Sequence, residues 1–174
     1  MTLTPTPGQT VGPFFGYALP FPHDNELVPP GTPGAVRLHG RVYDGAGDPV
    51  PDAILELWQT DAAGHVVQEA GSLRRDGYTF TGFGRASTDR EGRYGFSTLE
   101  PGAPFFALTV LARGLLNRLF TRAYLPGAGD DAFLQSLDAD RRSTLVTIRD
   151  ETGLVFDVHL QGDRETVFLS YPRH

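Results

Sequence analysis

The 174-residue sequence predicts an all-β fold: an antiparallel β-sandwich of about eight or nine strands, with an extended N-terminal arm and one short helix. Two observations support this prediction. Glycine and proline together occupy 35 of the 174 positions, which favours many short elements joined by turns. Between those turns, apolar and polar residues alternate with a period of two, as in strands that bury one face.

The first 35 residues predict an arm without regular structure. Eight prolines lie in this segment, and each removes a backbone donor and restricts the preceding residue to extended conformations. On composition alone, a disordered terminus is an equal alternative. We therefore divide the chain into an arm, residues 1–35, long enough to lie across a partner subunit, and a β-sandwich domain, residues 36–174.

The predicted strands follow the arm in order. Residues 36–43 alternate. Residues 105–112 are apolar apart from Thr109, as in a central strand covered on both faces, with a buried helix segment as the alternative. Asp-x-x-Gly at 61–64 and 89–92 predicts turns, because Asp bonds the turn backbone and Gly takes the left-handed position. The helix is expected at residues 130–137, after paired acids. The remaining strands are residues 53–60, 82–88, 93–98, 118–125, 144–148, 154–160 and 166–170.

Composition excludes several classes of function. All 15 basic residues are arginine and are outweighed by 21 acidic residues, so the net charge of −6 disfavours binding to nucleic acid. The absence of lysine and cysteine removes Schiff-base, P-loop and thiolate chemistry. No apolar run approaches the ~18 residues of a membrane span, and no signal peptide is evident, so we expect a cytoplasmic protein.

Local signals for catalysis or metal binding are weak. The five histidines are too widely spaced in sequence for a local metal motif. His39 and His159 lie on the polar faces of predicted strands, so we interpret them as solvated or hydrogen-bonded imidazoles. We interpret the pair Asp130 and Asp131 as helix caps, and the pair Arg74 and Arg75 as surface charge.

An ordered set of motifs resembles the intradiol ring-cleaving dioxygenases. The motifs are QTVGPFF (9–15), LHGRVYD (38–44), LELWQTD (55–61), GFGRASTD (82–89), GRYGF (92–96) and Pro-Gly at 101–102. The resemblance extends from about Thr10 to Tyr171. It implies a β-sandwich and, in iron-binding members, a ferric ion held by two tyrosinates and two histidines. Such a centre opens a catechol ring between its hydroxyls.

The sequence departs from the iron-binding members at residues 105–112. Those members carry His-x-His there, and the corresponding positions look like Phe105 and Ala107, neither of which can ligate iron. The resemblance therefore points to the metal-free subunit of two-subunit members, with no metal ligand and no catalytic residue in this chain. It implies an obligate heterodimer, assembled into a larger oligomer, with an iron-binding beta subunit that holds the Fe(III).

The resemblance also implies five residues that line the substrate pocket. Thr10, Gly12 and Pro13, with Phe14 beside them, match a segment that closes one side of the partner's iron pocket. A Gly-Pro backbone can approach a flat ring closely, and Thr10 offers a hydroxyl; a plain linker turn is the alternative. Arg113 matches an arginine that attracts a catecholate bearing a carboxylate, with an interface salt bridge as the alternative.

The expected function is that of a non-catalytic subunit that helps to bind a small aromatic substrate in an intradiol dioxygenase. One alternative is a self-sufficient homo-oligomer with iron ligands from His39, His159 and tyrosines. The other is a β-sandwich binding module, for small aromatics or a protein partner, that has kept the fold and lost the chemistry.

Overall fold

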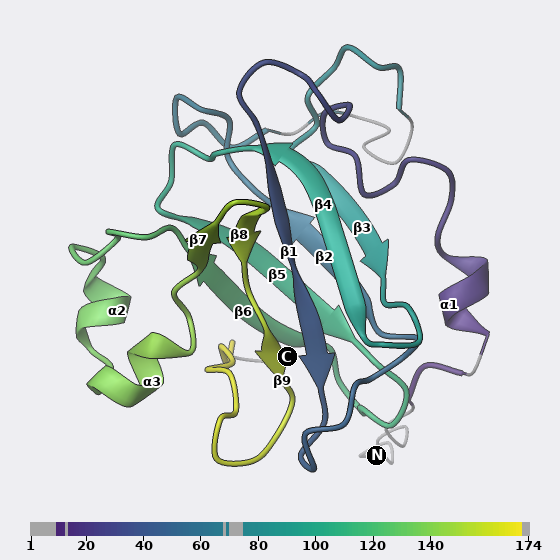
Figure 1. Cartoon of the computed structure of the whole chain (residues 1–174), viewed down its shortest axis with the longest axis vertical. Helices are drawn as coiled ribbons and strands as arrows, with labels where there is room; N and C mark the ends of the chain where they lie inside the picture. The colour runs from purple at the N-terminus through teal and green to yellow at the C-terminus, as the bar shows by residue number, and fades with distance from the viewer. Residues whose placement is uncertain (1–9, 13, 68, 70–74, 172–174) are drawn as a thin grey trace, which may run out of the picture.

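The computed structural model describes residues 10–12, 14–67, 69 and 75–171. Over these residues, nine strands form two sheets that pack face to face (Figure 1), which confirms the predicted β-sandwich. None of the helices in this part of the chain is long and apolar enough to cross a membrane.

The first sheet has five strands. They are β1 (Ala35–Tyr43), β4 (Arg93–Leu99), β7 (Ile148–Asp150), β8 (Gly153–Val155) and β9 (Val158–His159). The order is β4-β1-β8-β7, and β9 also pairs with β1. β1 is antiparallel to β4 along most of its length, from Ala35 opposite Leu99 to Arg41 opposite Arg93. β8 and β9 run parallel to β1, so this sheet is mixed.

The second sheet has four antiparallel strands in the order β3-β2-β5-β6. They are β2 (Ile54–Trp58), β3 (Phe83–Ser87), β5 (Phe105–Leu111) and β6 (Leu119–Tyr124). β5 lies between β2 and β6, as the apolar run predicts for an inner strand. Only one of its faces is fully covered, however. Phe106, Leu108 and Val110 are buried in the core between the sheets, whereas Phe105 and Ala107 are half-buried on the outer face.

The predicted strand 154–160 is interrupted at Phe156. Its alternation is correct, but Tyr94 donates its hydroxyl to the Phe156 carbonyl at 2.5 Å. Asp157 accepts a hydrogen bond from the Arg41 N–H at 2.9 Å. These side chains replace ladder bonds and divide the segment into β8 and β9. The chain passes so close to β1 that a Cβ on Gly40 would lie 1.9 Å from the Phe156 oxygen, which requires glycine there.

Two other strand predictions need correction. Residues 166–170 form one isolated bridge, Phe120 to Leu169, because Thr121 donates its hydroxyl to the Val167 carbonyl where a ladder bond would form. In residues 144–148, only a bridge from Val146 to Tyr124 and the first residue of β7 are extended pairings.

The predicted helix at 130–137 is confirmed as α2 (Ala132–Gln135), which is shorter than the predicted span. Asp131 caps it by accepting from the N–H groups of Phe133 and Leu134, as the paired acids indicated. Two further helices, α1 (Phe15–Ala18) and α3 (Ala139–Ser143), are single turns, too short to produce a helical period in the sequence.

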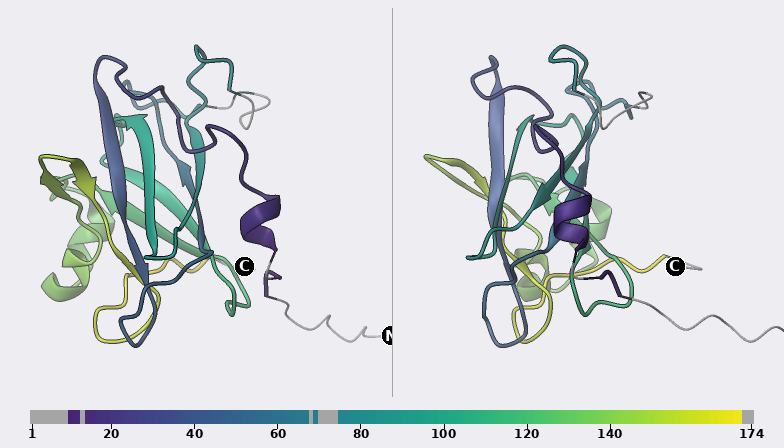
Figure 2. Two further views of the ribbon diagram at one scale, coloured as in Figure 1. Left: turned by 45° about the vertical axis from the view of Figure 1, so that its right-hand side comes forward. Right: turned by 90° about the vertical axis from the view of Figure 1, so that its right-hand side faces the viewer.

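The described part of the N-terminal segment packs on the sandwich. Leu27 and Val28 are buried, and the Leu27 N–H donates to Ser97 of β4 at 2.8 Å. Figure 2 shows α1 on the outer side of the four-stranded sheet, away from the five-stranded one. The interpretation of Arg75 as surface charge is wrong, and Arg74 lies outside the described residues. The half-buried guanidinium of Arg75 donates to the carbonyls of Asp24 and Phe83 at 2.8 and 2.7 Å and thereby holds this segment against β3.

Candidate functional site

Two of the predicted pocket segments meet at one end of the four-stranded sheet. The hydroxyl of Thr10 accepts a hydrogen bond from the Gly114 N–H at 2.9 Å. Gly114 follows Arg113 in the connection between β5 and β6, and its φ of +95° is in the left-handed region that glycine adopts without strain. The fold thus brings Thr10 next to the turn that carries Arg113, although the two are far apart in sequence.

The other predicted residues of this group are open to solvent. Arg113 and Gly12 are exposed, and the side chain of Phe14 is 75% exposed. A Cβ added to Gly12 would contact nothing within 4 Å, so no contact among the described residues requires glycine there. Pro13 lies outside the described residues. Exposure of a phenylalanine forgoes about 1.5–3 kcal/mol of burial free energy, a cost that a partner or ligand could remove.

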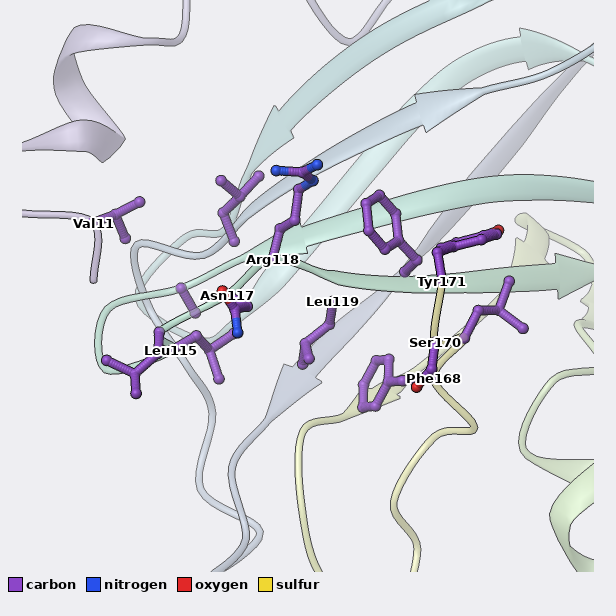
Figure 3. A pocket seen from close by; sticks show the side chains of 13 residues that line it. Val11, Leu115, Asn117, Arg118, Leu119, Phe168, Ser170 and Tyr171 are labelled. Atoms are coloured by element: carbon purple, nitrogen blue, oxygen red, sulfur yellow. The ribbon is translucent and has the colours of Figure 1, made fainter. Parts of the chain in front are cut away.

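A cavity of about 610 Å³ adjoins these residues (Figure 3). It is formed by Val11, by the connection from Leu115 to Arg118 with the start of β6, and by residues 168–171. Arg118 lies with its guanidinium carbon 5.1 Å from the centre of the Phe120 ring. Phe120 in turn meets the Tyr171 ring edge-to-face, with centroids 5.3 Å apart. Arg113 is not among the described lining residues.

The two positions that correspond to the family's His-x-His carry side chains without a metal-binding atom. Phe105 and Ala107 lie on the outer face of β5, and Arg122 of β6 is paired with Ala107. The guanidinium carbon of Arg122 lies 4.2 Å from the centre of the Phe105 ring. Arg122 also donates to the Tyr124 hydroxyl at 3.0 Å, which bonds Asp131 at 3.0 Å. The fixed positive charge of Arg122 at this position would repel a ferric ion.

Tyr43, Tyr94 and Tyr124 each contact other groups of the protein. Burial raises the pKa of Tyr94 well above its usual value and also raises the pKa of Tyr124. The Tyr94 hydroxyl donates to the Phe156 carbonyl, and that of Tyr124 bonds Arg122 and Asp131. Tyr43 stacks on His159 with ring centroids 4.9 Å apart and an interplanar angle of 13°. In the part of the chain that the structure describes, no three His, Cys, Asp or Glu residues converge as a metal site. Phe105 and Ala107, with Arg122 beside them, therefore do not fit a ferric centre at this position.

His39 and His159 are hydrogen-bonded, as the sequence predicted. The Nε2 atom of His39 lies 2.8 Å from the Thr152 hydroxyl, and that of His159 lies 2.9 Å from an Arg164 nitrogen. Partial burial lowers the pKa of both imidazoles, and neighbouring arginines lower it further. Each Nε2 already has a protein partner, which weakens the homo-oligomer alternative.

Comparison with known proteins identifies close relatives. A protein-family model described as "Dioxygenase" matches residues 11–127. The chain is 38% identical over 195 aligned residues to the protocatechuate 3,4-dioxygenase alpha chain of Burkholderia cepacia, covering 97% of this chain and 98% of that protein. It is 33% identical over 171 aligned residues to the beta chain of the same organism, covering 82% of this chain and 73% of that protein.

A solved structure shows the same fold. The dioxygenase domain of a carbohydrate-binding fusion protein from Streptomyces sp. SirexAA-E matches with a TM-score of 0.56 at 24% identity. The match covers 91% of this chain and 99% of that domain.

Proposed function

Because the chain belongs to the intradiol dioxygenase family, we propose that it is the alpha subunit of a protocatechuate 3,4-dioxygenase. The observation that carries this proposal is the 38% identity to an alpha chain over nearly the full length of both proteins. The assembled cytoplasmic enzyme uses O₂ to open the ring of 3,4-dihydroxybenzoate between its hydroxyls, giving 3-carboxy-cis,cis-muconate. Similarity to the beta chain supports a related, iron-binding beta subunit as the partner in an obligate heterodimer that assembles further.

In this proposal the beta subunit holds the Fe(III) and this chain holds none. The support comes from Phe105 and Ala107, which offer no metal-binding atom, and from Arg122, whose positive charge lies beside them.

This chain contributes to substrate binding through its N-terminal arm, residues 1–35, and the β5–β6 connection. Thr10 accepts from Gly114 and keeps its own O–H free to donate to a substrate oxygen or a bound water. The backbone at Gly12 and Pro13 approaches the ring, with Phe14 beside it. The exposed guanidinium of Arg113 attracts the carboxylate of the substrate.

Co-expression with an iron-binding beta chain tests this proposal. Oxygen uptake with 3,4-dihydroxybenzoate is measured for the purified complex, for this chain alone after iron loading, and for the beta chain alone. We expect enzyme-like turnover only in the complex. Ring cleavage at a comparable rate by this chain alone would refute the subunit assignment, and a failure of the two chains to associate would favour the binding-module alternative.

A further inference from the structure

Carboxylates are distributed unevenly along this acidic chain. None of the 21 Asp and Glu residues lies in residues 1–23, 101–129 or 166–174, although these segments make up more than a third of the sequence. The described parts of all three segments converge in the fold. Thr10 bonds Gly114, Leu169 donates its N–H to the Phe120 carbonyl at 2.7 Å, and the 610 Å³ cavity is lined from all three (Figure 3).

The charge of the residues that line this cavity differs from that of four other surface cavities in the described part of the chain. Arg118 is the one charged residue among its described lining residues. Four further surface cavities each include at least one carboxylate, for example Glu26, Asp76 or Asp140. Apolar side chains are exposed at and beside the same cavity, with Leu116 64% and Tyr171 45% accessible.

The outer face of the four-stranded sheet continues this surface. Arg122, Ala107 and Trp58 lie in one row across β6, β5 and β2, and Trp58 is 45% exposed. Glu56 is the one carboxylate within these four strands, and Arg85 pairs with it at 2.6 Å. We call the cavity, the β5–β6 connection and this part of the sheet the arginine face. It carries Arg113, Arg118 and Arg122 in a chain whose net charge is −6.

We propose that the arginine face docks the beta subunit through a partner surface on which carboxylates surround apolar side chains, one of which fills the cavity. The identity of the partner rests on the proposed function, whereas the face and the charge of its occupant follow from this chain. A second copy of this chain is a poor occupant, because a two-fold contact would place these arginines against one another. Nucleic acid is repelled by the net negative charge.

The test measures the affinity of purified beta chain for this chain and three variants. Arg118→Glu reverses the charge at the cavity, and Leu116→Asp introduces a carboxylate at a position too exposed to affect folding. Arg90→Glu makes the same charge change at an exposed position in the turn between β3 and β4 and serves as the matched control. Thermal unfolding of each variant confirms that it is folded.

We expect Arg118→Glu and Leu116→Asp each to weaken binding by about tenfold or more, and Arg90→Glu to have little effect. Wild-type affinity should fall as salt rises, because the contact is partly electrostatic. Equal affinity of all variants would overturn the docking face and leave the proposed function intact. No binding of the wild-type chain would overturn both. A dimer of this chain alone that Leu116→Asp dissociates would assign the face to a second copy and likewise overturn the inference.

Discussion

Ala107 and Arg122 face each other across β5 and β6, on the outer surface of the four-stranded sheet. The small side chain leaves room for the guanidinium to lie over the Phe105 ring, 4.2 Å from its centre. Arg122 also reaches the Phe133 ring at 5.6 Å and the Tyr124 hydroxyl, so it links the sheet to α2. The surface at the position of the family's His-x-His pair is thus built here around the guanidinium of Arg122.

Arg122→Ala should lower the free energy of unfolding by about 1–2 kcal/mol, because it removes the cation–π contact and the bond to Tyr124. Chemical denaturation checks this value. Arg90→Ala, at an exposed turn position, should stay within about 0.5 kcal/mol of wild type. Equal stability of the two variants would show that the stacked guanidinium contributes nothing.

Arg75→Ala should lower the free energy of unfolding by about 2–4 kcal/mol, since it removes the charge-assisted hydrogen bonds from the guanidinium to the carbonyls of Asp24 and Phe83. Arg75→Lys should recover part of the loss because an ammonium can reach fewer of these acceptors. Denaturation curves of both variants test this order. A lysine variant no better than the alanine variant would point to packing rather than hydrogen bonding.

The contributions of Asp24 and Asp76 to the free energy of unfolding should change in opposite directions with pH. Burial raises the pKa of Asp24 above the usual 3.8, whereas hydrogen bonds from Thr79 lower the pKa of Asp76 to about 2. The stability that Asp24 contributes is therefore full below pH 3.8 and is lost as pH rises through its folded pKa. The contribution of Asp76 is full above pH 3.8 and is lost as pH falls toward 2.

Unfolding free energies of wild type, Asp24→Asn and Asp76→Asn between pH 7 and pH 2.5 test these signs. As the pH falls, the unfolding free energy of the wild type should rise relative to that of Asp24→Asn. Relative to that of Asp76→Asn, it should fall. Parallel profiles for the two variants would contradict the assignment.

Arg113→Ala should raise the KM for 3,4-dihydroxybenzoate in the assembled enzyme by about 10- to 100-fold, the value of a charge-assisted contact. Iron content should stay unchanged. Catechol, which lacks the carboxylate, supplies the control: with this substrate the variant and the wild type should behave alike. An equal loss with both substrates would show that Arg113 acts only in docking the beta subunit and does not contact the substrate carboxylate.

Thr10→Val should reduce kcat/KM of the complex by about three- to tenfold, because it removes the acceptor for Gly114 and the hydroxyl at the pocket. Thr10→Ser keeps the hydroxyl and should retain most of the activity. Steady-state kinetics on both complexes distinguishes them, and an unaffected valine variant would remove Thr10 from the site.

The sandwich could be predicted from the sequence because alternation, apolar runs and Asp-x-x-Gly turns act locally. In the turns, Asp61 and Asp89 each accept from backbone N–H groups two and four residues ahead, and Gly64 and Gly92 have positive φ. The interruption at Phe156 could not be predicted, because it depends on the Tyr94 hydroxyl reaching across the sheet.

The cavity was missed for a similar reason. Its walls come from Val11, from the β5–β6 region and from residues 168–171. The motif around Val11 indicated the partner's pocket and not a cavity in this chain, and the other two wall segments carry no local binding motif. One signal was available: the three segments share an absence of carboxylates in a chain rich in them. The Thr10 and Arg113 predictions depended on resemblance, and only the fold brought Thr10 to the turn that contains Arg113.

In the proposed enzyme, this chain serves as the metal-free subunit. The most direct test is the iron content and visible absorption of the purified complex made with a beta chain whose His-x-His pair is replaced by alanine. We expect this complex to assemble but to lose its iron, its tyrosinate-to-Fe(III) colour and its ring-cleaving activity, whereas the wild-type complex should contain iron equimolar with the beta chain. Retention of equimolar, coloured iron in the altered complex would place a metal in this chain and refute its assignment as the metal-free subunit.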